Sequence, residues 1–132
     1  IRGFIGIASA PEFLENLMWK KFSKKVRQII MSQKIYYLKN ENYEYPLTKQ
    51  LIFDGRKNKV LNNKINLKIP LILFHGLSDR VVPLKTSKKI YKICNNSKRK
   101  LIKIKNGDHS LSRKSDLKKI CRELSCLIYH GI

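Results

Sequence analysis

Acidic residues are scarce in this sequence, which has 9 Asp and Glu against 29 Lys and Arg in 132 residues and a formal net charge of +20. Long apolar runs are also missing. Polar residues interrupt every candidate for a membrane-spanning helix, and the uncharged stretch 3–11 has only the length of a strand. A helix that crosses a bilayer needs about 20 predominantly apolar residues. The sequence therefore excludes a transmembrane protein.

Cysteine is limited to three positions, Cys94, Cys121 and Cys126, and no pair has the C-x-x-C spacing. An odd number does not suit a disulfide framework, and the spacing does not suit a zinc site. Residues 2–10 resemble a strand with small residues at its end and not a signal peptide. We therefore expect reduced thiols in a cytoplasmic protein. Because the first residue is Ile1 and not Met, we also expect that the natural beginning is missing.

The basic excess raises the hypothesis of nucleic-acid binding, because clustered Lys and Arg release counterions from phosphates. However, the sequence has 22 Lys, 17 Ile and 10 Asn but only two Ala, which is the bias of an AT-rich genome. The basic pairs at 24–25, 88–89 and 118–119 lie in different segments, and aromatic residues do not interleave with them as in single-strand binders. We expect a solvated basic surface without a specific nucleic-acid partner. A non-catalytic module that binds nucleic acid or anionic membrane is the alternative.

The periodicity of apolar residues predicts an α/β domain. Short apolar runs typical of strands lie at 3–9, 69–74 and 101–104, and helical spacing occurs at 12–31, 47–53, 86–94 and 117–128. The first helical stretch breaks near 20–23, the second ends at Asp54-Gly55, and residues 36–46 show no period. Strand and helix alternate in the second half, which indicates a parallel sheet. We expect one domain over 1–132, buried strands at 3–9 and 69–74, and a cap-like insertion of helices and irregular segments over about 12–60.

Two loops at the ends of predicted strands carry the side chains best suited to catalysis. Residues 75–83 contain Asp79 and residues 106–113 contain His109. The carboxyl ends of parallel strands meet at one edge of a sheet, so Asp79 and His109 are expected to lie side by side. A carboxylate that accepts the Nδ1 proton of a histidine leaves Nε2 free to act as a general base.

These loops resemble the C-terminal half of an α/β-hydrolase fold enzyme, with H-G-x-x-D-x-x-V-P at 75–83 and G-D-H-x-L-S-R at 107–113. The sequence is most similar to the branch that includes mitochondrial palmitoyl-protein thioesterase and acyl-glucuronide esterase and their bacterial relatives. Further matching segments are G-I-A-S-A-P-E-F at 6–13, L-M-W at 17–19, Y-P-L-T at 45–48 and D-G-R at 54–56. The resemblance implies that Asp79 is the triad acid, that His109 is the general base, and that residues 12–60 cover the substrate, an acyl ester or thioester. It implies no cofactor and no metal.

The nucleophile of such an enzyme is missing from this sequence. The G-x-S-x-G elbow is absent, and Ser9 in G-I-A-S-A has neither its spacing nor its second glycine. In this fold the elbow and the loop that supplies the other oxyanion donor would lie before Ile1. We therefore expect an incomplete α/β-hydrolase fold with its last three parallel strands, flanking helices and a helical cap. It should be inactive unless an N-terminal half, supplied separately or on a longer chain, completes it. A degraded gene remnant is a further alternative.

Other side chains have weaker claims to a role in the site. Met18 and Trp19 could line an acyl pocket, although apolar residues at helical spacing are more often core. Asp108 is expected to shape its own loop, and His75 to be a packed or turn histidine. His130 is expected on the surface.

One further pair is expected to stabilise the fold. Arg113 and Asp116 could form an ion pair at the start of the last helix, where an acidic side chain also interacts favourably with the helix dipole.

The sequence leaves open the acyl chain length and the choice between ester and thioester.

Overall fold

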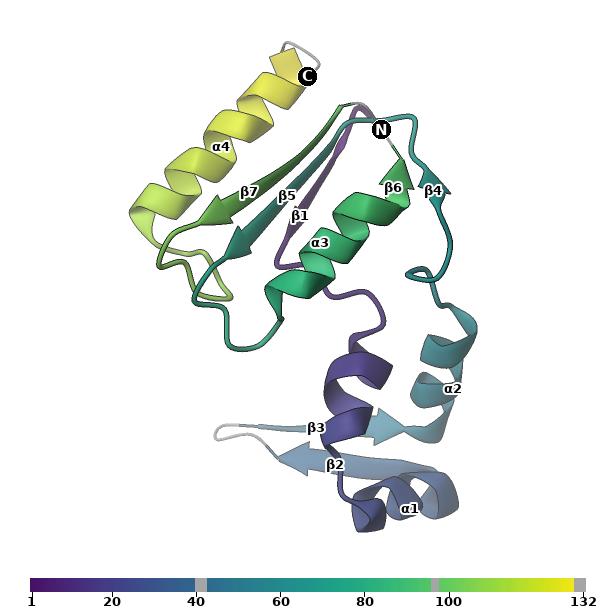
Figure 1. The fold of residues 1–132 in the computed structure, drawn as a ribbon. Helices are drawn as coiled ribbons and strands as arrows, with labels where there is room; N and C mark the ends of the chain where they lie inside the picture. Colours follow the sequence, from purple (N-terminus) through teal and green to yellow (C-terminus); the bar gives the residue numbers. More distant parts are fainter. Residues whose placement is uncertain (40–42, 96–97, 130–132) are drawn as a thin grey trace. The chain divides into compact units, whose positions relative to one another are not determined.

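The computed structural model describes residues 1–39, 43–95 and 98–129 (Figure 1). The chain divides into two compact units. Unit 1 contains Ile1–Ala10 and Leu61–Ile132, and unit 2 contains Pro11–Val60. No helix in the described ranges is both long and apolar enough to span a membrane.

Unit 1 is built on a three-stranded parallel sheet in the order β1 (Phe4–Ile7), β5 (Leu71–Gly76) and β7 (Arg99–Ile104). Every residue of the central strand β5 is buried, which agrees with its continuous apolar sequence. The predicted α/β class with three parallel strands is confirmed.

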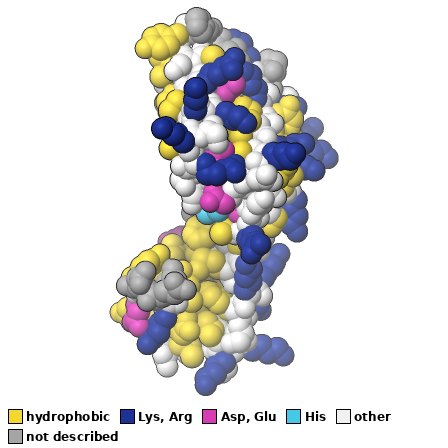
Figure 2. Space-filling view, turned by 90° about the vertical axis from the view of Figure 1, so that its left-hand side faces the viewer, with side chains coloured by type: hydrophobic (Ala, Val, Ile, Leu, Met, Phe, Trp, Pro, Cys, Tyr) yellow, Lys and Arg dark blue, Asp and Glu magenta, His cyan; other side chains and the backbone are white. Residues whose placement is uncertain are grey.

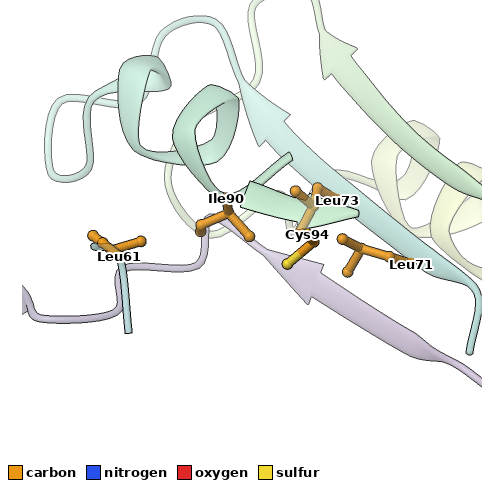
Figure 3. Packing of buried hydrophobic residues seen from close by; sticks show 5 residues of the cluster. All are labelled: Leu61, Leu71, Leu73, Ile90 and Cys94. Carbon is orange, nitrogen blue, oxygen red and sulfur yellow. The ribbon is translucent and has the colours of Figure 1, made fainter. Parts of the chain in front are cut away.

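One helix covers each face of this sheet, α3 (Leu84–Ile93) on one side and α4 (Lys114–Tyr129) on the other (Figure 1). Successive side chains of β5 point to opposite faces. The cluster on the α3 side contains Leu61, Leu71, Leu73, Ile90 and Cys94 (Figure 3). The cluster on the α4 side contains Ile72, Phe74, Ile104, Leu111 and Leu127. The sheet is thus held between two apolar layers, and its carboxyl ends remain available for loops.

The expected pair at the start of α4 is present. The Arg113 guanidinium donates from Nε to Asp116 Oδ2 at 2.7 Å and from Nη2 to Oδ1 at 3.0 Å. The hydrogen bonds from Arg113 lower the pKa of the Asp116 carboxyl, although its burial acts in the opposite direction. This bidentate pair anchors the first turn of α4 beside the loop that contains His109.

The prediction that the first strand is buried on both faces is wrong. Phe4 is 51% exposed and Ile7 is 43% exposed, and only Gly6 of β1 is buried. The reason is that β1 pairs with β5 on one side only and forms an edge of the described sheet.

Unit 2 packs short helices on a two-stranded antiparallel hairpin. Its elements are η1 (Leu14–Met18), η2 (Trp19–Lys21), α1 (Lys24–Gln33), β2 (Ile35–Lys39), β3 (Glu44–Thr48) and α2 (Lys49–Lys57). Its buried cluster contains Leu14, Ile30, Leu47 and Ile52. The break predicted near 20–23 is present, because the Ser23 hydroxyl accepts a hydrogen bond from the Val26 N–H and caps α1.

Two expectations for this unit are wrong. Residues 36–46 are largely a hairpin, although 40–42 lie outside the described residues. Tyr36 and Leu38 pack against the buried cluster together with Tyr45. Every second residue of the first strand therefore faces the core, which is the period of a strand and not that of a helix. The helix α2 also continues through Gly55 to Lys57 instead of ending at Asp54-Gly55.

In unit 1, β4 (Ile65–Asn66) and β6 (Cys94–Asn95) form a short parallel pair that was not predicted.

Candidate active site

The loops after β5 and β7 lie against each other at the carboxyl end of the sheet. The Leu77 N–H donates to the Ile104 carbonyl at 2.9 Å, and the Ser78 N–H donates to the Gly107 carbonyl at 2.8 Å. A Cβ atom on Gly76 would lie 2.3 Å from the carbonyl oxygens of Gly107 and Asp108. The contact between the two loops therefore requires glycine at position 76.

The side chain of Asp79 is fully buried in the first of these loops. Its Oδ1 accepts the backbone N–H groups of Val81 at 2.8 Å and Val82 at 2.9 Å. Its Oδ2 lies 3.0 Å from His109 Nδ1. The structure thus brings together the two side chains that the sequence placed at neighbouring strand ends.

The protonation of this pair follows from its partners. Burial alone would raise the pKa of the Asp79 carboxyl. The N–H groups of Val82 and Val81 and the hydrogen bond to His109 outweigh burial, so the pKa lies below its ordinary value. The ionised carboxylate can only accept, so His109 donates its Nδ1–H to Asp79, and in the neutral imidazole Nε2 is then the acceptor nitrogen. The His109 side chain is 43% exposed, which leaves it accessible to a reactant.

The depressed pKa of Asp79 predicts a loss of stability in acid. A carboxyl group with a lower pKa in the folded state stabilises the fold above its ordinary pKa, and this contribution is lost as the pH falls through the folded value. The free energy of unfolding should therefore decrease between about pH 5 and pH 2. Asp79→Asn should flatten this dependence in urea titrations. Asp116→Asn should remove a separate part of the same slope, since the pKa of its carboxyl is lowered as well. An equal slope in wild type and Asp79→Asn would contradict the prediction.

The loop that presents His109 has an unusual backbone. Asn106 and Leu111 adopt φ values of 56° and 46°, in the left-handed region that Leu rarely visits. Leu111 is fully buried, and its N–H donates to Asp108 Oδ1 at 2.8 Å. Asp108 therefore shapes its own loop, as predicted, and the buried Leu111 side chain fixes the turn that follows His109.

His75 is completely buried beneath the acid loop, as expected for a packed histidine. Its Nε2 lies 3.1 Å from the Val82 carbonyl and its Nδ1 lies 2.7 Å from the hydroxyl of Ser87. A carbonyl can only accept, so His75 donates from Nε2 and accepts the Ser87 hydroxyl at Nδ1. His75 therefore holds Val82 by its carbonyl, while the N–H of Val82 binds Asp79.

Sequence reasoning missed Ser87. Its position in the sequence indicates burial, because Ser87 precedes Ile90 by one helical turn and therefore lies on the apolar face of α3, where both residues are buried. Because Ser87 is fully buried and its hydroxyl is used by His75, it lacks the exposure that a nucleophile needs. The pair instead supports the loop that carries Asp79.

Met18 and Trp19 lie in unit 2, where both pack against the buried cluster of that unit. The Trp19 ring is covered by the guanidinium groups of Arg56 at 4.8 Å and Arg27 at 5.7 Å from its centroid. These contacts agree with the core interpretation, and the acyl-pocket role of the two residues stays a prediction.

The remaining candidates add no further centre. Across residues 1–39, 43–95 and 98–129, no group of three or more His, Cys, Asp or Glu side chains could hold a metal ion. His130 lies outside the described residues. The three cysteines are free thiols, with Cys94 buried and Cys121 exposed.

Several solved structures share the fold of this chain. A hydrolase from Agrobacterium vitis S4 is 25% identical, with a TM-score of 0.87 over 96% of this chain and 49% of its own. Alpha/beta hydrolase domain-containing protein 10 from mouse is 23% identical, with a TM-score of 0.77 over 94% of this chain and 50% of its own. Est1E from Butyrivibrio proteoclasticus, solved with ferulic acid bound, is 18% identical, with a TM-score of 0.61 over 95% of this chain and 51% of its own. No curated protein matches the sequence.

The chain thus spans about half the length of these hydrolases, which agrees with the expected partial α/β-hydrolase domain. The family model for serine hydrolases (FSH1) matches residues 20–120, which include both Asp79 and His109. The chain belongs to the FSH1 family of α/β-hydrolase fold serine hydrolases.

Proposed function

We propose that this chain is the half of an ester- or thioester-cleaving serine hydrolase that carries the triad acid Asp79 and the general base His109. The observation that carries the proposal is the hydrogen bond between these residues across two neighbouring strand ends. The buried, ionised Asp79 holds the His109 ring in one tautomer and stabilises the imidazolium that forms during catalysis.

The reaction needs a serine hydroxyl that the G-x-S-x-G elbow of the preceding half would supply. His109 Nε2 takes the hydroxyl proton as the serine oxygen bonds to the acyl carbon. It then gives this proton to the leaving oxygen or sulfur as the bond to the acyl group breaks. In the second half-reaction His109 takes a proton from water as the water oxygen bonds to the acyl carbon, and it returns this proton to the serine oxygen as the acyl–serine bond breaks, which releases the acid. The preceding half would also supply the oxyanion hole, so the chain alone should be inactive.

Unit 2 is proposed to act as the cap that binds the acyl group. It exposes large hydrophobic side chains, namely Phe13, Tyr37, Tyr43, Leu51, Phe53 and Val60, and such exposure in a small unit is typical of a ligand or partner surface. The segments at 6–13, 17–19, 45–48 and 54–56 favour the thioesterase and acyl-glucuronide esterase branch of the fold. Est1E, which was solved with ferulic acid, supports an ester as the substrate class.

The test compares the chain alone with the completed hydrolase, which is the chain together with the polypeptide encoded immediately upstream of Ile1, fused or co-expressed. We expect the completed hydrolase to react with a fluorophosphonate probe and to turn over p-nitrophenyl esters of graded acyl length. The chain alone should do neither. A chain that turns over esters by itself, or a completed hydrolase that reacts with neither reagent, would overturn the proposal.

A further inference from the structure

The strand β5 carries one polar side chain, His75, after an otherwise apolar sequence. The four residues before it, 71–74, are apolar and buried, and His75 itself has no exposed surface. A buried imidazole lowers stability unless its nitrogens find partners. His75 has two, the Ser87 hydroxyl 2.7 Å from Nδ1 and the Val82 carbonyl 3.1 Å from Nε2. An apolar side chain would fill this place without needing partners, so the value of a histidine here lies in the groups that it holds.

His75 cannot contact a substrate. Its side chain is fully buried, whereas the side chain of His109 is 43% exposed. Figure 2 shows accessible histidine surface on unit 1, next to acidic side chains, and because His75 is fully buried, this surface is not part of it. Any effect of His75 on the reaction must therefore pass through the residues that it holds.

The path from His75 to the triad acid runs through the backbone of Val82. His75 Nε2 lies 3.8 Å from Asp79 Oδ2, which is too far for a hydrogen bond. The Nε2–H is instead donated to the Val82 carbonyl, and the Val82 N–H is donated to Asp79 Oδ1 at 2.9 Å. Val82 is only 2% exposed, so water cannot readily replace His75 at this carbonyl. Without the donor, the carbonyl must shift to find another partner, and the N–H that holds Asp79 would move with it.

We propose that His75 is a positioning residue, which keeps the Asp79 carboxylate directed at His109 by holding the backbone of Val82. Asp79 Oδ2 lies 3.0 Å from His109 Nδ1, and this contact depends on how the carboxylate is turned. A carboxylate turned away from Nδ1 neither fixes the tautomer nor stabilises the imidazolium. The role requires the donor at Nε2 of His75 and not the contact with Ser87. It rests on the proposed function, because only there does Asp79 orient a catalytic base.

Two substitutions of His75 separate the donor at Nε2 from the filling of space. In His75→Gln the amide nitrogen reaches the place of Nε2 and can donate to the Val82 carbonyl. In His75→Asn the shorter amide reaches only the place of Nδ1, where its oxygen can accept the Ser87 hydroxyl. In the completed hydrolase, His75→Asn should lower kcat by about 100-fold and leave KM within about twofold of wild type, because the acid moves and the substrate contacts do not. His75→Gln should keep kcat within a few-fold of wild type.

Ser87→Ala is the matched control on the other side of the ring. It removes the hydroxyl at Nδ1 but leaves the donor at Nε2, so kcat should also stay within a few-fold of wild type. The tautomer of His109 is a second measurement, read at a pH where the ring is neutral from the NMR shifts of its two nitrogens, which are assigned by their loss in His109→Ala. Wild type, His75→Gln and Ser87→Ala should carry the proton on Nδ1 alone, whereas His75→Asn should show both tautomers. A role in packing alone would change stability and not the tautomer.

Urea unfolding and ester turnover of the same samples separate the possible failures. Equal losses of kcat per folded molecule in His75→Asn and His75→Gln would overturn the positioning role and leave the proposed function standing. The same conclusion follows from a His75→Gln variant that folds but shows both tautomers, and this result is decisive even where His75→Asn does not fold. Tautomers that follow the expected pattern in a completed hydrolase without turnover would support the positioning role and contradict the proposed function.

Discussion

Asp79→Asn is expected to lower kcat of the completed hydrolase by about 10,000-fold, the scale seen when a triad acid is replaced by its amide. Asn can still accept the two backbone N–H groups at its carbonyl oxygen, so the loop should keep its shape. Its amide nitrogen, however, would face His109 Nδ1 and favour the tautomer in which Nε2 carries the proton. The base would then be blocked although the fold is intact. Steady-state turnover of a p-nitrophenyl ester measures this loss.

The control for this prediction is Asp108→Asn, which changes the carboxylate next to His109 in sequence. Asp108 accepts the Leu111 N–H through one oxygen, and the carbonyl of Asn can do the same. Its kcat should therefore stay within a few-fold of wild type, whereas His109→Ala should match the loss in Asp79→Asn. If Asp108→Asn were the more damaging substitution, Asp108 and not Asp79 would be the carboxylate that serves His109.

The three strands of the parallel sheet, β1, β5 and β7, and the pairing of Asp79 with His109 could be predicted from the sequence. Continuous apolar runs are a strong signal for strands buried on both faces, and the order strand, helix, strand, helix fixes which loops share an edge. Asp79 and His109 then follow, because they lie in the loops after β5 and β7. For β1, the prediction that the strand is buried on both faces was wrong. Its run 3–9 has the composition of a buried strand, yet in the structure Phe4 and Ile7 are exposed at the edge of the sheet. The composition of β1 is thus that of a strand with neighbours on both sides.

The missed features share a different cause. The hairpin of unit 2 is built from Tyr36, Leu38 and Tyr45, whose rings and side chains are only partly buried, so its alternation is weak in hydropathy. The partner of His75 could not be predicted, because Ser87 is twelve residues away and becomes its neighbour only when α3 packs on β5. Polar contacts between elements depend on packing geometry, which periodicity does not encode.

Gly76→Ala is expected to separate the acid from the base without touching either. The added Cβ would lie 2.3 Å from two backbone carbonyl oxygens of the base loop, so the backbone of one loop must move. Overpacking of this kind costs about 3 kcal/mol of the free energy of unfolding. A shift of about 1 Å between Asp79 and His109 should lower kcat by about 100-fold. Urea unfolding and ester turnover of the completed hydrolase measure the two effects.

Gly55→Ala provides the matched control for this substitution. Gly55 lies within α2, where a Cβ would meet only the side chain of Leu14, at 3.2 Å from Cδ1 and 3.8 Å from Cβ. Alanine also favours a helix over glycine by about 1 kcal/mol, so the free energy of unfolding should change by no more than about that amount, with kcat preserved. Wild-type stability and turnover in Gly76→Ala would mean that the two loops can move apart while the Asp79 and His109 hydrogen bond persists. In that case the pair would be held by the network from Ser87 through His75 and Val82, and not by the close approach of the two loops.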